Sequence, residues 1–420
     1  MGASADDELW FVPGFRELAS ASDVLAGALD ASHLLPPDRV EDLVRQAGRS
    51  IGATDVSMWV IDYGQATLVP IGDHGDDSAG GRGATLAVAS TTAGRAFARA
   101  EAIESAEPDA HRWIPLLDGT ERLGVIRFAF PGPLTDVDRR RVDALASLAG
   151  ELLVGKREHT DHYTLRRRRR EMNLAAEMQW QQLPPLESAT PSAEVAGFVE
   201  PAYGVGGDGF DYSLNDDVLD LVIYDAVGHG LHAALLSTLT IASLRHARRC
   251  RLDLAARLDA ADEAIAAEFR GDFVTAQVAQ LSTTTGSLTW VNAGHPPPIL
   301  VRDGGVVGEL ACEPRPPIGF HRLQTSSTVV ATVQLQPGDR VLFYTDGLVE
   351  GGRRGGSRFG FDRLADLLGR TDAEGLGCAE TIRRLGHSVL EHAAFELHDD
   401  ATMLLVEWRG MPVRSPVVVP

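Results

Sequence analysis

The chain has little cysteine and no long apolar run, and both shortages narrow the classes of protein it can belong to. Its 420 residues include only three cysteines, Cys250, Cys312 and Cys378, which lie far apart without the spacing of metal ligands. This pattern argues against a disulfide framework and fits a reducing compartment. No stretch reaches the roughly 18 apolar residues of a membrane-spanning helix, and the acidic start lacks a signal-peptide layout. We therefore expect a cytoplasmic protein.

Positive charge is also scarce. The formal net charge is −20, which would repel phosphate backbones, so neither nucleic acid nor a membrane is an expected partner. The local exception is the run Arg166 to Arg170, whose arginines would surround a helix on all sides. We interpret this run as a solvated helix face; contact with an acidic partner or with a second subunit is the alternative.

The length suits two domains, each with its own core. Pattern divides the chain into an N-terminal extension (1–37), an α/β region (38–156), a charged connector helix (157–190), a C-terminal domain (191–409) and a tail (410–420). The connector carries apolar residues at roughly helical offsets: Leu165, Met172, Ala176 and Leu183. An exposed helix would not need this stripe, so we expect it to pair with a second copy in a homodimer.

The region 38–156 reads as helix, hairpins and a closing helix. Asp118-Gly119 between two apolar runs indicates a hairpin, and Thr135 with Asp138 indicates the start of the last helix. The order resembles a GAF domain, a ligand-sensing module, down to the strand Leu-Gly-Val-Ile-Arg-Phe and the helix start Leu-Thr-Asp-Val-Asp. The resemblance implies a small ligand that the sequence does not identify. A packing or dimerisation domain without a ligand is the alternative.

The C-terminal region alternates apolar, β-branched strands with helices. The expected strands are 218–224, 273–281, 288–292, 340–345 and 401–407, and a mostly apolar helix over 231–244 should be buried. Strands from distant parts of the chain with helices outside them predict two antiparallel sheets covered by helices. The fold class is therefore α+β.

Carboxylates stand where these strands begin or end: Asp208 and Asp211, Asp225, Asp346, and Asp399 with Asp400. A single aspartate at a strand end is more often just a turn. If several strand ends coincide, however, the carboxylates converge, and converging carboxylates are stable only when protons or cations neutralise them. Oxygen ligands of this kind select Mg²⁺ or Mn²⁺ over zinc.

The sequences around these carboxylates occur in a fixed order. They are Gly-Gly-Asp-Gly-Phe-Asp, Asp-Ala-Val-Gly-His-Gly-Leu-His-Ala-Ala-Leu, Val-Asn-Ala-Gly-His-Pro-Pro-Pro, Tyr-Thr-Asp-Gly-Leu-Val-Glu and Asp-Asp-Ala-Thr. Together they resemble the PPM-type phosphatases of the SpoIIE/RsbU class, bacterial regulators that dephosphorylate anti-anti-sigma factors. The resemblance extends over nearly all of 191–409.

The resemblance implies a role for each position. It implies two Mn²⁺ or Mg²⁺ ions bridged by Asp225, with the Ala226 carbonyl helping on one ion. It also implies that Asp208, Asp346 and Asp399 are further ligands, so that these aspartates carry catalysis with a water held between the ions. Asp211, His229 and Asp400 are candidates for orienting water around the ions. The expected substrate is a phosphorylated regulatory protein of the anti-anti-sigma type.

Two other functions are compatible with parts of this pattern. One is a sensor scaffold whose phosphatase-like domain binds a phosphoprotein or a kinase without turnover, against which the retained aspartates argue. The other keeps the chemistry but acts on a nucleotide or a small phosphomonoester. No complete Gly-x-x-x-x-Gly-Lys-Ser/Thr motif is present, since Arg157 follows the Gly-x-x-x-x-Gly-Lys run at 150–156, and this weighs against nucleoside triphosphates.

Overall fold

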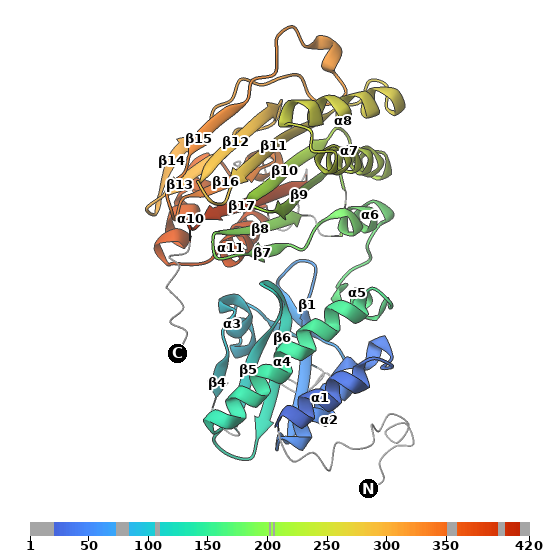
Figure 1. Cartoon of the computed structure of the whole chain (residues 1–420), viewed down its shortest axis with the longest axis vertical. Coiled ribbons are helices and arrows are strands. Elements are labelled where there is room, and N and C mark those ends of the chain that lie inside the picture. The colour runs from blue at the N-terminus through green and yellow to red at the C-terminus, as the bar shows by residue number, and fades with distance from the viewer. Residues whose placement is uncertain are drawn as a thin grey trace. The chain divides into compact units, whose positions relative to one another are not determined.

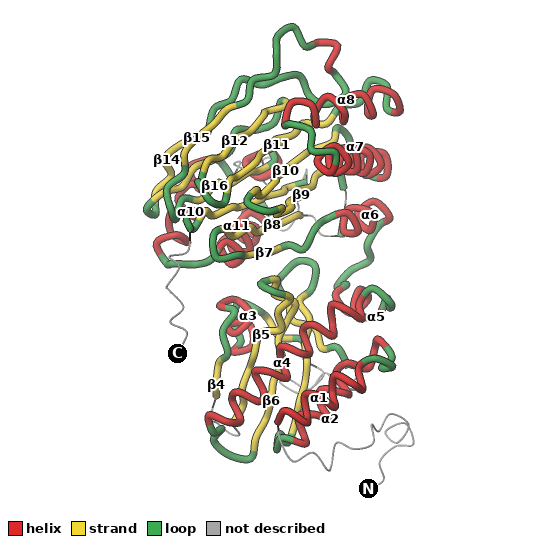
Figure 2. The backbone as a smooth tube through the Cα atoms, viewed as in Figure 1, coloured by secondary structure: helices red, strands yellow, loops and turns green. Residues whose placement is uncertain are grey.

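The computed structural model describes residues 21–72, 84–105, 110–200, 203–204, 206–350, 359–393 and 400–411. The chain forms two compact units, Met1–Arg170 and Glu171–Pro420, which are treated separately below and are traced in Figures 1 and 2. Among the described residues, no helix is both long and apolar enough to cross a membrane.

The N-terminal unit is built on one antiparallel sheet with the strand order β3-β2-β1-β6-β5-β4. Its elements are α1 (Ala21–Ser32), η2 (Pro37–Arg39), α2 (Val40–Ser50), β1 (Asp55–Ile61), β2 (Thr67–Pro70), β3 (Leu86–Ala87), α3 (Thr92–Arg99), β4 (Ile103–Ser105), β5 (Ala110–Asp118), β6 (Glu121–Phe130), α4 (Asp136–Arg157) and α5 (His162–Arg167). The expected β5–β6 hairpin and the capping box of α4 are both confirmed.

Alternation along β1 gives this sheet two apolar faces. Val56 and Met58 point to the side covered by α1, α2 and α4, whereas Trp59 and Ile61 point to the side covered by α3. Successive strand residues face opposite sides, so a continuous apolar strand is buried on both. The unit is therefore a sheet between two helical layers.

This unit begins earlier and ends later than the expected range 38–156. Val24 and Ala28 of α1 and Tyr163 of α5 belong to the same buried core as α2 and α4. The described part of the expected extension 1–37 thus contributes a helix to the sensor-like unit, because its apolar side covers the sheet.

The single connector helix predicted for 157–190 is wrong. The segment contains the end of α4, the short α5, a separate α6 (Leu174–Gln182) and the strand β7 (Glu187–Ala189). The arginine run disfavours a continuous helix through like-charge repulsion, and the Asn173 side chain starts α6 by accepting a 2.8 Å bond from the Ala176 amide. Leu165 is 60% exposed while Ala176 is fully buried, so the predicted apolar stripe does not lie on one face.

The C-terminal unit contains two antiparallel sheets, with orders β15-β12-β11-β10-β9 and β14-β13-β16-β17-β8-β7. The remaining elements are β8 (Ala193–Glu200), β9 (Asp208–Asn215), β10 (Val218–Ala226), α7 (Leu231–Arg249), α8 (Leu254–Glu268), β11 (Val274–Ser282), β12 (Ser287–Ala293), β13 (Ile299–Arg302), β14 (Gly305–Glu309), η3 (His321–Leu323), β15 (Ala331–Gln334), β16 (Arg340–Tyr344), α9 (Asp346–Glu350), α10 (Phe361–Ala373), α11 (Cys378–His392) and β17 (Ala401–Trp408).

Three apolar cores separate four layers in this unit. One core lies between the sheets, one joins α7 and α8 to the β9–β12 sheet, and one joins the helices α9 to α11 to the other sheet. The expected sandwich of two antiparallel sheets flanked by helices is confirmed, and Figure 1 shows α7 and α11 on opposite outer sides. The space between the sheets is where strand-end side chains from both sheets meet.

The two sheets pack closely where a glycine of one faces an aromatic ring of the other. Gly197 of β8 points into the space between the sheets, and a Cβ atom there would overlap the ring of Phe210 on β9. Phe210 is fully buried and cannot move aside without disturbing the core. The closeness of the sheets at this point therefore depends on the missing side chain.

We expect Gly197→Ala to lower the free energy of unfolding of the C-terminal unit by about 1–3 kcal/mol, the usual cost of overpacking. Denaturant unfolding followed by circular dichroism measures the change. Gly305→Ala is the control, because a Cβ atom there would meet only the Arg302 carbonyl at 3.7 Å. Equal stability of the two variants would contradict the overlap.

Candidate metal centre

Two of the predicted aspartates face each other across neighbouring strands. Asp208 is the first residue of β9, and Asp225 is its register partner near the end of β10. Leu221 and Ile223, which share the face of Asp225 by strand alternation, belong to the core between the sheets. Both carboxylates therefore project into the inter-sheet space at one end of the sandwich.

The other sheet brings further polar groups to the same end. The Gly207 amide, directly before β9, donates a 2.9 Å hydrogen bond to Oδ2 of Asp400, directly before β17. Thr345, directly after β16, accepts a 2.9 Å bond from the Thr402 amide through its hydroxyl. The Gly207–Asp400 bond thus joins the two sheets where the carboxylates gather, and the Thr345–Thr402 bond holds β16 to β17 within the second sheet.

Burial and neighbouring carboxylates act together on Asp208. Asp208 is 3% exposed, and burial, followed by the carboxylates of Asp225 and Asp400, raises its pKa well above the usual range, although a bond from the Thr345 hydroxyl acts in the opposite direction. Within the described residues, Oδ2 of Asp208 is buried and has no hydrogen-bond partner. Such an oxygen among like charges is costly, and a hard divalent cation would satisfy it.

Backbone contacts fix Asp208 in place. Its carbonyl accepts a 2.7 Å bond from Nε2 of Gln179, a buried residue of α6. The neighbouring Gly207 carbonyl accepts a bond from the Ser237 hydroxyl. A Cβ atom on Gly207 would lie 2.9 Å from the Ala226 carbonyl oxygen. Only glycine lets this loop pass so close to the carbonyl that the sequence assigned to the metal site.

The other predicted ligands lie at the same strand ends, but the structure brings them together unequally. Asp346 is exposed as the first residue of α9, next to Thr345, and His229 is exposed in the loop between β10 and α7. Asp399 lies outside the described residues. Asp400, predicted only as an outer residue, is 7% exposed and takes part directly in the electrostatics of Asp208.

Asp211 has a different role from the one expected. It is 2% exposed, and its carboxylate binds Arg245 at 2.7 Å and Arg248 at 2.8 Å, both on α7. It lies three residues after Asp208 on β9, so strand alternation directs it to the helix-covered face. It therefore attaches α7 to the sheet and does not orient water in the inter-sheet space.

His295 shapes a turn after β12. Asn292 binds both its backbone groups at 2.8 and 2.9 Å, and its Nδ1 lies 2.8 Å from the Thr275 hydroxyl. Burial lowers the pKa of His295 to about 3, so the ring is neutral. Since Thr275 of β11 is the register partner of Asp225, the histidine supports the strand beside the one that carries that carboxylate.

Sequence reasoning missed Thr345 and Gln179. Thr345 could have been found, because it is a polar residue directly after an apolar strand. By strand alternation it also shares the inter-sheet face with Val341 and Phe343. Gln179 lies in the segment interpreted as a connector, and nothing in its local pattern indicates that it reaches the carbonyl of Asp208.

Much of the C-terminal unit is similar to a known protein family. Residues 215–409 match the family model described as Stage II sporulation protein E (SpoIIE). The match includes Asp225, Asp346 and Asp400 and begins after Asp208. It does not extend to the N-terminal unit, so the GAF resemblance there stays a prediction.

Individual relatives match only in part. Protein IcfG of Synechocystis sp. is 26% identical over 205 residues, covering 42% of this chain and 32% of IcfG, so the chain spans about a third of the length of that relative. The solved RsbU and RsbW domains of Rv1364c from Mycobacterium tuberculosis are 29% identical with a TM-score of 0.46, covering 55% of this chain and 64% of that one. The SiaA-PP2C domain of Pseudomonas aeruginosa is 24% identical with a TM-score of 0.47, covering 56% and 94%.

Two further solved chains contain metal ions. RsbX was crystallised with magnesium, and the catalytic domain of the serine/threonine phosphatase PstP was crystallised with 2 manganese ions. The bound ions are findings about RsbX and PstP.

We expect Asp208→Asn to stabilise the metal-free protein while reducing its stabilisation by Mn²⁺. The folded state raises the pKa of Asp208, so it binds the proton more tightly than the unfolded chain. Stability from this group is then present at low pH and is lost as pH rises through the raised pKa. The advantage of the variant in EDTA should grow as the pH rises over the range from the ordinary pKa of an aspartate to the raised pKa of Asp208.

Thermal unfolding of both proteins across this pH range, with EDTA or with Mn²⁺, measures the effect. Asp216→Asn, an identical change in the turn between β9 and β10, is the matched control and should behave as wild type. If the Asp208 variant is less stable than wild type in EDTA at every pH, the buried carboxylate does not destabilise the metal-free protein and the expectation is wrong.

Proposed function

The C-terminal unit carries a SpoIIE-family serine/threonine phosphatase domain, and from this premise we propose that the protein dephosphorylates a phosphoprotein with two Mn²⁺ or Mg²⁺ ions at the Asp208–Asp225 cluster. The observation that carries the metal assignment is the buried, unpartnered Oδ2 of Asp208, facing the carboxylates of Asp225 and Asp400. Carboxylate and carbonyl oxygens are the ligands these ions prefer.

Each residue of the cluster has a distinct part in this proposal. Asp225 would bridge the ions with the Ala226 carbonyl beside it, and Asp208, Asp346 and Asp399 would complete the ligand set. When bound, the ions activate water and stabilise charge on the phosphoryl group.

The surrounding residues hold these ligands rigidly. Gln179 and the Thr345 hydroxyl fix Asp208, and the bond from the Gly207 amide to Asp400 keeps the strand ends of the two sheets together. His229 would border the site from its exposed loop, where it can orient water.

The proposed substrate is a phosphorylated regulatory protein of the anti-anti-sigma type. Its support is the ordered set of SpoIIE/RsbU-like motifs, together with the family match over 215–409. The site lies at the end of the sandwich and includes the exposed Asp346, so a phosphorylated side chain on a folded protein could reach it. Activity on a small phosphomonoester but on no phosphoprotein would favour the alternative substrate class.

We further propose that the N-terminal unit is a GAF-like sensor that regulates this site. Its support is the antiparallel sheet between helical layers and the short path along the chain to the catalytic strands. The unit ends at Arg170, and α6, which begins at Leu174, supplies the Gln179 contact to Asp208. A change in α6 would therefore act on a ligand strand directly.

Phosphatase activity should vanish in EDTA and return with Mn²⁺ or Mg²⁺. Asp225→Asn should lower turnover by about 10²-fold or more, the scale of losing a main electrostatic element. Release of phosphate from a phosphorylated anti-anti-sigma domain, and from an aryl phosphate, measures both. Asp216→Asn is again the control. Activity that persists without metal would exclude the two-ion site, and no turnover of either substrate would favour a silent scaffold.

Gln179→Ala should raise the Mn²⁺ concentration needed for half-maximal activity by about 10-fold, the lower range for losing a group that orients a metal ligand. Gln182→Ala on the same helix is the control, because its side chain binds Thr238 and the Met178 carbonyl but not the cluster. A Gln179 variant with unchanged metal dependence would leave α6 as a spacer.

The apolar stripe on which we based the expected homodimer does not form. Two leucines near the unit boundary are nevertheless exposed, Leu165 at 60% and Leu174 at 62%. We expect the full chain to be dimeric in multi-angle light scattering and the double change Leu165→Gln, Leu174→Gln to weaken the dimer. A monomeric wild-type chain at micromolar concentration would disprove the expectation.

A further inference from the structure

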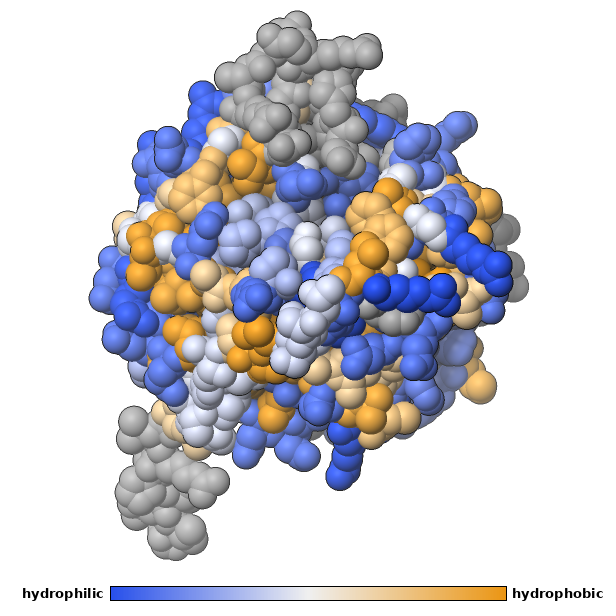
Figure 3. Space-filling view, turned by 90° about the horizontal axis from the view of Figure 1, so that it is seen from above, coloured by the Kyte–Doolittle hydropathy of each residue, from blue (hydrophilic) through white to orange (hydrophobic). Residues whose placement is uncertain are grey.

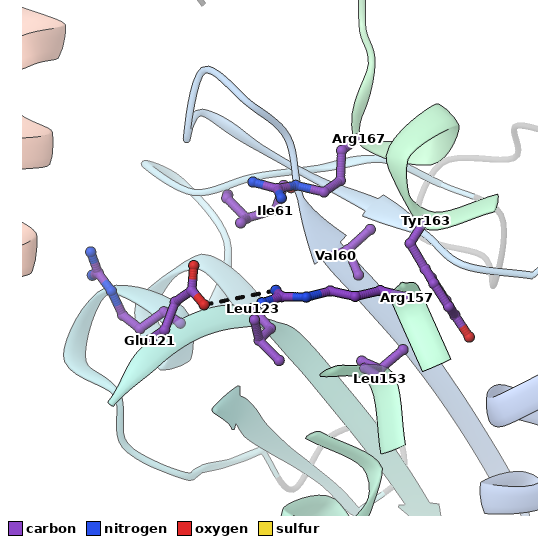
Figure 4. A pocket seen from close by; sticks show the side chains of 9 residues that line it. Val60, Ile61, Glu121, Leu123, Leu153, Arg157, Tyr163 and Arg167 are labelled. Atoms are coloured by element: carbon purple, nitrogen blue, oxygen red, sulfur yellow. Dashed lines mark hydrogen bonds and ion pairs between the residues drawn. The ribbon is translucent and has the colours of Figure 1, made fainter. Parts of the chain in front are cut away.

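A hollow lies beneath the last helix of the N-terminal unit, between α5, the end of α4 and the sheet (Figure 4). Its volume is about 40 Å³, well below the roughly 300 Å³ at which sites for drug-sized ligands begin, so any ligand must be small. All lining residues come from this unit, and none belongs to the metal centre.

The wall of the hollow is mostly apolar. Val60 and Ile61 from β1, Leu123 from β6 and Leu153 from α4 line it, and Tyr163 of α5 stands beside them. Tyr163 is anchored elsewhere, since its hydroxyl donates a 2.5 Å bond to the Pro37 carbonyl. The hollow therefore presents a carbon surface, and not polar groups, to the body of a ligand.

Positive charge stands at one side of this apolar wall. Figure 4 shows the side chains of Arg157 and Arg167 extending side by side toward the end of the hollow where Glu121 lies. Nε of Arg167 donates a 3.0 Å bond to the Ile61 carbonyl, and its guanidinium lies 4.3 Å from the centre of the Tyr63 ring. These contacts hold one cation in place at the rim.

Arg157 is held much more loosely. Its guanidinium is 3.8 Å from the Glu121 carboxylate, beyond hydrogen-bond reach, and its side chain is 36% exposed. An anion entering the hollow could form the close, charge-assisted bonds that Glu121 does not. Arg122 also lines the hollow, but its guanidinium lies over the Phe97 ring and bonds the Ala98 carbonyl.

We propose that this hollow binds a small organic anion: a carboxylate on a short apolar body. The apolar wall takes the body, and Arg157 with Arg167 takes the carboxylate. Two cations against one Glu121 favour an anion over a neutral or cationic ligand. The arginines also exclude a bare metal cation.

The position of the hollow connects it to the preceding proposal. It is closed on one side by α5, the last helix before the unit boundary at Arg170. The bound anion would be the signal of the proposed sensor, and only this biological role rests on the proposed function. Binding can be measured without phosphatase activity, so failure of the catalytic proposal leaves it standing.

The test is isothermal titration calorimetry on the full-length chain. The probes are short straight and branched carboxylates, from acetate to hexanoate, with hexanol, leucine and inorganic phosphate as comparisons. We expect at least one carboxylate to bind, while hexanol and phosphate, which lack one half of the recognised chemistry, bind at least 10-fold more weakly.

Two variants locate the site. Arg157→Gln should weaken binding by about 10-fold or more, the effect of losing a charged hydrogen bond, and Leu123→Phe should reduce it by filling the hollow. Arg140→Gln, an exposed arginine of the same helix α4, is the charge-matched control. Arg157 is partly exposed, so its variant should fold even if Leu123→Phe does not.

The proposal is overturned if no carboxylate of the panel binds, or if Arg157→Gln binds as tightly as Arg140→Gln. Tighter binding of leucine than of its matched carboxylate would overturn it as well, since Glu121 would then be recognising an ammonium group.

Discussion

The acidic end of the C-terminal unit depends on carboxylates of both sheets that lie close together, one of them deeply buried. Asp208 and Asp225 meet across adjacent strands, and Asp400 joins them from the other sheet, with one oxygen of Asp208 buried and unpartnered. A fold does not keep such a cluster for stability, because an apolar replacement would cost less. The arrangement is understandable if cations complete it, and the local backbone is built to hold it open.

The sandwich supplies this arrangement through strand alternation and close sheet packing. Alternation puts Asp208 on the inter-sheet face and Asp211 on the helix face, so two nearby carboxylates on one strand have opposite roles. Gly197 lets Phe210 pass close to the opposite sheet, and Gly207 lets its loop approach the Ala226 carbonyl. The rigidity of this end of the unit comes from these contacts and from the bond between Gly207 and Asp400.

The proposed regulation would have a physical route along the chain itself. The segment expected to be one connector is divided between the units: α5 closes a hollow in the first, and α6 bonds a ligand strand in the second through Gln179. The arginine run separates the two helices. A ligand beneath α5 would therefore have to influence α6 through this short segment and not through one continuous helix. A change in the few residues between them would be sufficient.

The sequence by itself determined the two domains, the sandwich of antiparallel sheets and the strand ends that carry the acidic cluster, because alternation and strand-terminal aspartates are local patterns. It could not determine which carboxylates meet. Asp400 and Asp208 are far apart in sequence, and Asp211 differs from Asp208 only by the strand face it occupies once α7 packs. The break between α5 and α6, the burial of α1 and the contact of Gln179 were likewise decided by tertiary packing, because each depends on a partner distant in the chain.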